Sequence, residues 1–295
     1  MMRTGSTAGL SDKIQRGIIY VIIGAFALFC FLPLLLMVIV SFTSEISIIA
    51  NGYSFFPAEW SLRAYRMLFA SNSLVPSAYR VTITVTLIGT LVAVLITYGA
   101  GYTLASKQCR YRDTLSLYFY ITMVFSAGLV PWYMINRNMG FYNNLWALIV
   151  PSLMFSPFNM FLMRNFIRGL PEELSESARI DGAGEMRIAF SIYFPLALPV
   201  VATVTLFYAI AYWNNFFNAI MLVRDREFFP LQMLLFRIQS EITEMRMIGM
   251  VGGGLPPREG FIMATAVITM GPIILLYPFL QKYFVKGIVV GAVKG

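Results

Sequence analysis

The sequence predicts an all-α integral membrane protein, and two observations lead to that fold class. Of the 295 residues, 58% are hydrophobic and only 12% are charged, and the mean hydropathy is +0.72. Such a composition is far from that of an average soluble domain. Moreover, six long stretches contain no charged residue: 17–42, 81–105, 114–136, 145–163, 197–223 and 260–281. About twenty apolar residues in a helix cross a bilayer, so we expect six transmembrane helices in one domain over 1–295.

The distribution of cations predicts that both termini face the cytoplasm, because short cytoplasmic loops carry an excess of Lys and Arg. With the amino terminus inside, every lysine of the chain falls on the cytoplasmic side: Lys13, Lys107, Lys282, Lys286 and Lys294. The formal net charge of +8 then describes a basic membrane face. We therefore expect membrane lipid as a partner and no nucleic acid.

The residue types present argue against catalytic activity in this chain. It has no histidine, and its two cysteines lack the CxxC spacing of metal sites. A nucleophile with an adjacent base is not evident, and no GxxxxGK[ST] phosphate loop occurs. We expect a transport subunit that is not an enzyme, with no cofactor and no metal in this chain.

Two segments on the expected outer side carry structural signals. The segment 43–80 contains Trp60 and an amphipathic run over 62–69, which predicts an interfacial helix or a partner-docking surface. The segment 249–258 reads GMVGGGLPPR, and its glycines and prolines predict an exposed loop.

The expected inner loop between the fourth and fifth helices, 164–199, has structure of its own. Pro171 suits the first turn of a helix, the following glutamates favour its positive end, and Gly182 supplies a left-handed stop. A second short helix is expected from Gly184 to Tyr193, ended by Pro195 and Pro199. The loop is thus predicted to be a cytoplasmic helix-turn-helix that binds a partner.

Residues of this loop resemble the EAA loop of permeases in ATP-binding-cassette importers. The resemblance rests on an acidic residue, the small residues beside it, an Asp-Gly turn and a pair of prolines, all at the spacing of that family. These positions are Glu176, Ser177, Ala178, Asp181, Gly182, Ala183, Ile192, Pro195 and Pro199. Ser177 departs from the alanine of the family pattern but is also small. The tail 281–295, QKYFVKGIVVGAVKG, is similar to that of MalG-type subunits, and Gly128-Leu129-Val130-Pro131 is similar to the LplC-like branch, which includes alginate and pectin permeases.

The resemblance implies a permease subunit of an oligosaccharide importer in the bacterial cytoplasmic (inner) membrane, crossing it several times. The loop would couple to an ATPase, with Glu176 meeting a basic residue and Ala178 and Ala183 allowing close approach. Partners would be a second permease, two ATP-binding cassette subunits that hold ATP and Mg, and an extracytoplasmic solute-binding protein. That protein would meet Gly252, Gly253 and Gly254, while Lys286, Gly291 and Lys294 of the tail would reach the ATPases. An acidic oligosaccharide such as alginate or pectin fragments is the expected substrate.

A polar and aromatic set on the fourth and fifth helices suits a sugar path: Tyr208, Tyr212, Trp213, Asn214, Asn215, Asn218 and Asn159. Aromatic rings stack on sugar faces, and amides bind hydroxyls without adding charge. The competing interpretation is helix packing, since asparagine commonly bonds one membrane helix to another.

A secondary transporter of a polar solute and an intramembrane enzyme are the alternatives. Secondary transporters usually carry ionisable groups at membrane depth, and the six stretches have none.

Overall fold

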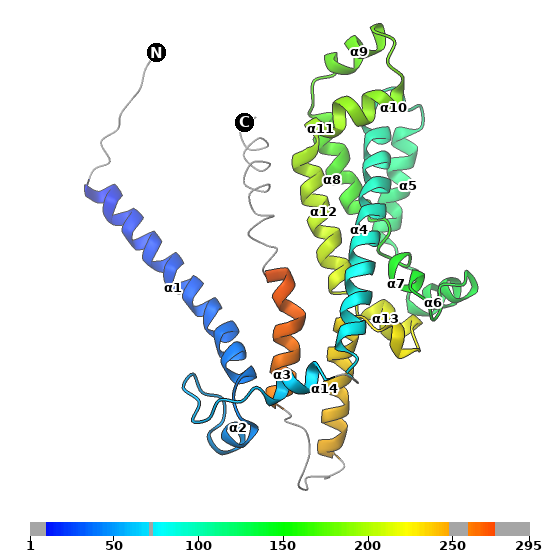
Figure 1. Cartoon of the computed structure of the whole chain (residues 1–295). Coiled ribbons are helices and arrows are strands. Elements are labelled where there is room, and N and C mark those ends of the chain that lie inside the picture. The colour runs from blue at the N-terminus through cyan, green and yellow to red at the C-terminus, as the bar shows by residue number, and fades with distance from the viewer. Residues whose placement is uncertain (1–9, 71–72, 248–258, 275–295) are drawn as a thin grey trace. The chain divides into compact units, whose positions relative to one another are not determined.

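The computed structural model describes residues 10–70, 73–247 and 259–274, and the regular elements of these segments are helices (Figure 1). This confirms the predicted helical class. The described residues fall into two units, one within the bounds Met1–Ala70 and Met245–Ile268 and the other within Ser71–Glu244 and Thr269–Gly295. The two predicted partner-binding segments, 249–258 and 281–295, lie outside the described residues.

The first unit contains α1 (Leu10–Ser41), α2 (Glu45–Asn51) and α3 (Arg63–Leu68). Helix α3 falls within the amphipathic run predicted over 62–69 and buries Ala64 and Leu68. The carboxylate of Glu45 accepts hydrogen bonds from the backbone N–H groups of Glu259 and Gly260, both at 3.2 Å. These are orphan donors at the start of the helix 259–274, so Glu45 acts as its cap.

The second unit is built around α4 (Val75–Ala105), which packs against α8 (Pro157–Arg168) and α12 (Leu198–Trp213). Glycines allow the close approach. A Cβ on Gly89 would lie 2.5 Å from the ring of Tyr212 on α12, and one on Gly101 would lie 2.8 Å from Met163 on α8. Small residues at helix contacts are typical of membrane bundles, where packing drives association.

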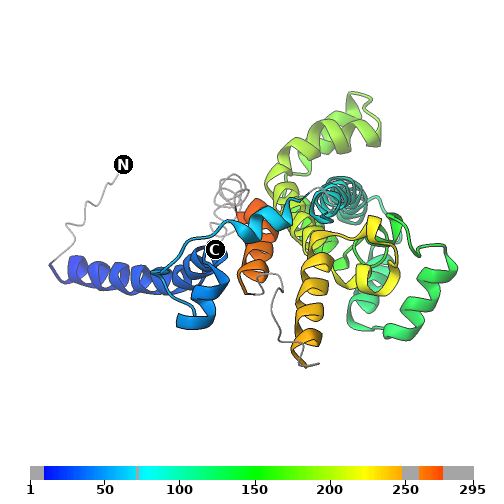
Figure 2. The ribbon, with the colours of Figure 1, turned by 60° about the horizontal axis from the view of Figure 1, so that its bottom comes forward.

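The other elements of this unit lie at both ends of these helices. Figure 1 shows α9 and α10 beyond one end of α4, while α6 and α13 lie toward the other, and Figure 2 shows α9 and α10 extending away from the packed helices. Their bounds are α5 Arg112–Val124, α6 Leu129–Asn138, α7 Trp146–Ile149, α9 Glu173–Ile180, α10 Glu185–Arg187, the π-helix η1 Ile188–Tyr193, α11 Phe194–Leu196, α13 Phe217–Leu222, the 3-10 helix η2 Arg226–Phe228 and α14 Leu231–Met247.

In the described part of the chain, two helices are long and apolar enough to cross a membrane: α1, from Ile14, and α4. The number rises to four if each of two bent pairs forms one span. One pair is α5 with α6, bent by 115°, and the other is Glu185–Leu196 with α12, bent by 83°.

Three of the apolar stretches predicted as continuous helices are interrupted. The stretch 114–136 breaks before Gly128, whose φ of +86° leaves the helical region, and 145–163 breaks at Ser152, with φ of +65°. The stretch 197–223 breaks at Asn214, after which α13 starts at Phe217. Hydropathy detects the apolar length of a stretch but carries no information on its backbone conformation, so these breaks were not predicted.

Candidate functional site

The loop predicted to couple to an ATPase folds as two short helices around a tight turn. Helix α9 starts at Glu173, so Pro171 precedes the helix instead of lying in its first turn. At its end, the Gly182 N–H donates to Arg179 O at 3.0 Å and the Ala183 N–H donates to Ala178 O at 2.9 Å. These two bonds form a Schellman motif. Gly182 has φ of +78°, which confirms the left-handed stop predicted there.

The second half of the loop differs from the prediction, because the helix does not end at Pro195. Helix α10 continues through the π-helix η1 into α11, and Pro195 lies in the first turn of α11. Pro199 likewise lies in the first turn of α12. A proline is tolerated in a first turn, and the wide π turn before Pro195 avoids the clash with the preceding carbonyl. The direction changes at Ala197, between the two helices.

The residues of the EAA-like pattern divide into an outer and an inner set. Glu176, Ser177, Asp181 and Gly182 are exposed, whereas Ala178, Ala183 and Ile192 are half-buried and pack against the chain's own core. The two alanines therefore allow α9 and the turn to approach this core closely. The outer set is what the loop offers to a partner.

Two apolar side chains on the same loop are strongly exposed and were missed from the sequence. Ile180, the last residue of α9, is 86% exposed, and Met186 on α10 is 72% exposed. They flank the Asp181-Gly182 turn. The available signal was an isoleucine at the end of a mostly polar helix, directly before the Asp181-Gly182 turn. Exposed apolar side chains beside an exposed acid are typical of a protein-docking surface.

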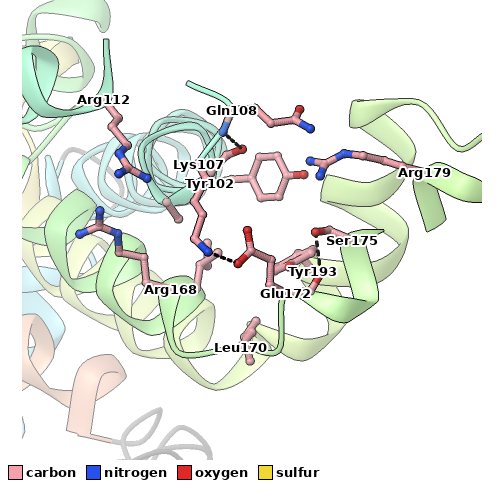
Figure 3. Close-up of a pocket in the computed structure, with 13 residues that line it drawn as sticks. Tyr102, Lys107, Gln108, Arg112, Arg168, Leu170, Glu172, Ser175, Arg179 and Tyr193 are labelled. Atoms are coloured by element: carbon pink, nitrogen blue, oxygen red, sulfur yellow. Dashed lines mark hydrogen bonds and ion pairs between the residues drawn. The ribbon is translucent and has the colours of Figure 1, made fainter. Parts of the chain in front are cut away.

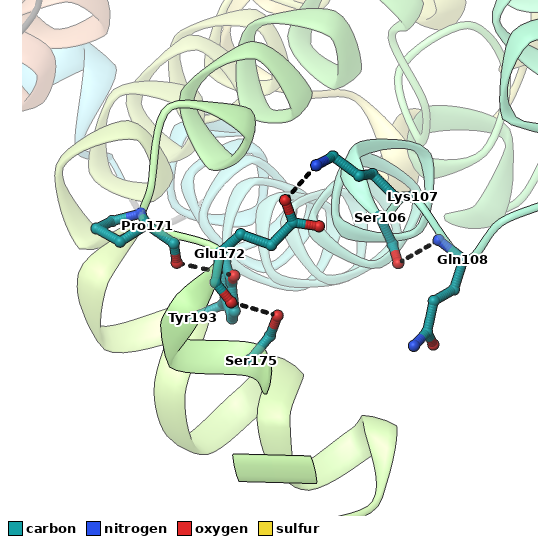
Figure 4. A network of polar contacts seen from close by, with 7 residues as sticks. All are labelled: Ser106, Lys107, Gln108, Pro171, Glu172, Ser175 and Tyr193. Carbon is teal, nitrogen blue, oxygen red and sulfur yellow. Dashed lines mark hydrogen bonds and ion pairs between the residues drawn. The ribbon is translucent and has the colours of Figure 1, made fainter. Parts of the chain in front are cut away.

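Polar contacts join the start of α9 to the loop after α4 and to η1 (Figure 4). Lys107 forms an ion pair with Glu172, and the Ser175 hydroxyl donates to Glu172 O at 2.8 Å. The Tyr193 hydroxyl donates to Pro171 O at 3.3 Å. The hydrogen bond that Lys107 donates to the Glu172 carboxylate raises the pKa of Lys107. A raised lysine pKa adds stability that is lost only as the pH rises through the folded-state value, so this contact persists at neutral pH.

A second set of contacts fixes the turn itself. Arg179 Nε lies 2.9 Å from Glu185 Oε1, and the Tyr102 hydroxyl donates to Glu185 Oε2 at 3.2 Å. The Gln108 amide, turned with its oxygen toward Arg179, accepts from Arg179 Nη1 at 3.0 Å and donates to Glu185 Oε1 at 3.1 Å. The helix-turn-helix is thus held from α4, α9 and α10 together. Individual exposed ion pairs contribute little, but a connected set fixes orientation.

A cavity of about 360 Å³ lies beside this loop (Figure 3). Its walls come from the end of α4, the start of α5, the end of α8 and α9. Cationic side chains predominate among its charged lining residues, which are Lys107, Arg112, Arg168, Arg179 and Glu172.

The chain is similar to known transport proteins over nearly its whole length. The family model described as "Binding-protein-dependent transport system inner membrane component" matches residues 3–290. The chain belongs to this family. It is therefore a membrane component of a bacterial transport system and is not an enzyme, as the sequence predicted.

Several relatives are similar over nearly their full length. The polygalacturonan/rhamnogalacturonan transport system permease protein YtcP of Bacillus subtilis is 36% identical, over 97% of this chain and 100% of that protein. Protein LplC of B. subtilis is 37% identical, over 90% of this chain and 89% of its own. A chain of a bacterial ABC transporter that imports the acidic polysaccharide alginate superposes with a TM-score of 0.81 at 30% identity, covering 94% of this chain and 98% of that one. The predicted resemblance to LplC-like carbohydrate permeases is confirmed.

Most of the residues predicted for a sugar path are buried and hydrogen-bonded within the chain. Tyr212 Oη donates to Ile149 O at 2.9 Å, Asn215 Nδ2 to Leu148 O at 3.1 Å and Asn218 Nδ2 to Pro151 O at 2.7 Å. The carbonyls of Leu148 and Ile149 belong to the end of α7 and that of Pro151 to the break after it, where the helix does not continue to supply N–H partners. The three side chains replace those partners, as backbone at membrane depth requires.

The rest of the predicted set divides in the same way. Tyr208 accepts a hydrogen bond from Ser156 N at 2.9 Å, and Trp213 donates to Thr269 O at 2.9 Å. Asn159 is 6% exposed, near the start of α8. Asn214 is the exposed residue of the predicted sugar path, and its Oδ1 accepts a hydrogen bond from Gln232 Nε2 at 2.9 Å.

Proposed function

We propose that this chain is one of two membrane-spanning subunits of an ATP-driven importer of acidic oligosaccharides. The observation that carries the proposal is the exposed turn at Asp181 and Gly182, flanked by Ile180 and Glu176, in a chain that belongs to this transport family. The turn stands beyond the end of the helix bundle and is held there by contacts to α4. A partner that binds it can therefore transmit movement to the bundle.

The proposed topology is one domain of six spans with both termini in the cytoplasm. The interrupted stretch 145–163 counts as a span because carbonyls at its break accept hydrogen bonds from Tyr212, Asn215 and Asn218. The end of α8 and the start of α5 carry Arg164, Arg168 and Arg112, and Lys107 follows α4. Positive charge concentrated at one end of three neighbouring helices supports a cytoplasmic position for the coupling loop.

The proposed partners are a second permease, two ATPase subunits and an extracytoplasmic solute-binding protein. ATP and Mg would be bound by the ATPases, which would receive α9 and α10 and the tail 281–295. The loop 249–258 would meet the binding protein. The importer would open a path between the two permeases, to which Asn214 contributes an exposed amide from this chain.

Two relatives that are named for the transport of acidic polysaccharides, YtcP and the alginate importer, support an acidic substrate. The test is ATP hydrolysis by the complete complex, reconstituted with its binding protein and supplied with oligogalacturonate, alginate oligosaccharide or neutral maltooligosaccharide. We expect at least one acidic oligosaccharide to stimulate hydrolysis several-fold and the neutral one to have no effect. Stimulation by the neutral sugar alone would reject the substrate class while leaving the ATP-driven mechanism intact.

The coupling role of Glu176 is tested by reversing its charge. Glu176 is exposed on α9, and no ion pair holds it within the described chain. A Glu176→Lys variant places like charges against the basic residue expected on the ATPase, which costs several kcal/mol at an interface. We expect the amount of copurified ATPase to fall more than tenfold at matched permease levels.

Glu227→Lys provides the matched control, because Glu227 is also exposed but lies on η2, near the start of α4 and so at the opposite end of that helix from the coupling loop. It should retain ATPase binding within about twofold, as a charge away from the contact does. Equal binding by wild type and Glu176→Lys would remove this acid from the interface.

A further inference from the structure

The cavity beside the coupling loop has a surplus of positive charge that the described part of the chain does not neutralise. Of its cationic lining residues, Lys107 and Arg179 are paired with Glu172 and Glu185. Arg168 has no carboxylate within 4.0 Å among the described residues. The wall that carries Lys107 and Arg179 is therefore neutralised, whereas the wall that carries Arg112 and Arg168 stays cationic.

Two guanidinium groups, those of Arg112 and Arg168, lie on that second wall, and the charge of Arg164 lies close to both. Arg164 and Arg168 are four residues apart on α8 and so lie on one face, where like charges repel. Arg112 comes from α5, and Figure 3 shows the Arg112 and Arg168 side chains pointing toward one another. Asp113 reaches Arg112 at only 3.7 Å, and the buried Nε of Arg164 has no hydrogen-bond partner among the residues that the structure describes. One additional anion would reduce this repulsion.

The cavity lies where membrane helices end. It is lined by residues just after α4, at the first position of α5 and at the last position of α8. Immediately along α5, Leu115 and Leu117 are 39% and 58% exposed, and Tyr111 before the helix is 62% exposed. An aromatic residue beside exposed leucines marks the boundary between headgroups and acyl chains. An anion that binds here can therefore have acyl chains beside α5.

We propose that this cavity binds the phosphate group of an anionic phospholipid. Arg112 and Arg168 would hold the phosphate, since a guanidinium matches phosphate oxygens through paired N–H donors. A volume of about 360 Å³ accommodates a small headgroup. A basic pocket between membrane helices on the cytoplasmic side is suited to such lipids, whereas the ammonium of a zwitterionic headgroup would face the cationic wall.

The site is connected to the coupling loop through Lys107, which lines the cavity and pairs with Glu172 directly before α9. A bound lipid would therefore steady the base of α9. This inference goes beyond the proposed transport function, because it concerns a lipid ligand and holds for any transported sugar.

The test measures lipid retained by the complete complex. Native mass spectrometry would be applied to complexes incubated with phosphatidylglycerol or with phosphatidylcholine, comparing wild type with the double variant Arg112→Gln and Arg168→Gln. Each cation near an anionic headgroup contributes about fivefold in affinity, so losing two lowers phosphatidylglycerol binding about 25-fold. Arg110→Gln, a matched charge removal in the same loop outside the cavity lining, is expected to stay within about twofold of wild type.

The outcomes separate the sources of the anion. Phosphatidylglycerol binding that resists millimolar inorganic phosphate and requires both arginines supports the proposal. Binding of inorganic phosphate alone, with no preference for phosphatidylglycerol over phosphatidylcholine, overturns the lipid assignment. It is equally overturned if the double variant keeps wild-type lipid binding, or if it loses ATPase copurification with lipid binding unchanged, which would assign the arginines to a protein contact.

Discussion

A Gly182→Val variant is expected to reach the membrane with its helices packed but to lose at least nine-tenths of its ATPase binding and sugar-stimulated hydrolysis. Gly182 has φ of +78° at the end of α9. A β-branched residue is a genuine outlier in this region, and holding it there costs roughly 1–3 kcal/mol. The turn can relieve this strain by leaving the Schellman geometry, which would displace Ile180 and Asp181 from their present positions.

The physical cause is backbone strain and not internal crowding, because a Cβ on Gly182 would meet nothing within 4 Å. Two controls use this. Gly182→Asn adds a side chain that tolerates positive φ, and Gly184→Val adds the same valine where φ is −70° and ψ is 158°. Both should keep most of the ATPase binding, measured by copurification at matched permease levels. An equal loss in Gly184→Val would mean that added bulk, not strain, disrupts the contact.

The turn at Gly182 could be predicted because its determinants are local. A glycine after a short helix with glutamates in its first turn defines where α9 ends, whatever packs around it. The path of the chain around Pro195 could not be predicted in the same way. The π turn of η1 depends on how the helix meets the core through Ile188 and Tyr193, both buried. Propensity alone therefore predicted an earlier end to the helix.

The interrupted spans show the same limit. Nothing near Pro151 in the sequence states that its carbonyl will bond to Asn218, 67 residues later. The amides of Asn215 and Asn218 were predicted as sugar ligands or as packing groups, and the geometry places both in packing within this chain. Asn214 stays a candidate for the path because its side chain is exposed. The types of residue identified these polar side chains in the sequence. Only the tertiary structure separates those that pack within the chain from the one that is exposed.

Gly89→Leu is expected to prevent assembly of the second unit, with the largest loss of folded protein among the variants considered. Gly89 is buried on α4, and its Cβ would lie 2.5 Å from Cζ and 2.6 Å from Cε1 of Tyr212. The Tyr212 ring is held by the backbone at one end and by its hydroxyl hydrogen bond at the other, so moving it costs free energy. Tyr212 is 1% exposed, and its hydroxyl satisfies Ile149 O. Overpacking costs about 1–3 kcal/mol, and an orphaned buried carbonyl adds about 1–3 kcal/mol.

The measurement is the fraction of permease recovered as monodisperse complex after detergent extraction at increasing temperature. Gly99→Leu is the control on the same helix, since a Cβ at Gly99 meets nothing within 4 Å, and it should match wild type. A milder pair tests the contact itself. Because Tyr212→Leu removes the ring that Gly89→Ala would strike, the double variant should be less destabilised than the sum of the two single changes, by about 0.5–3 kcal/mol. Strict additivity would show that α4 and α12 do not meet at this glycine.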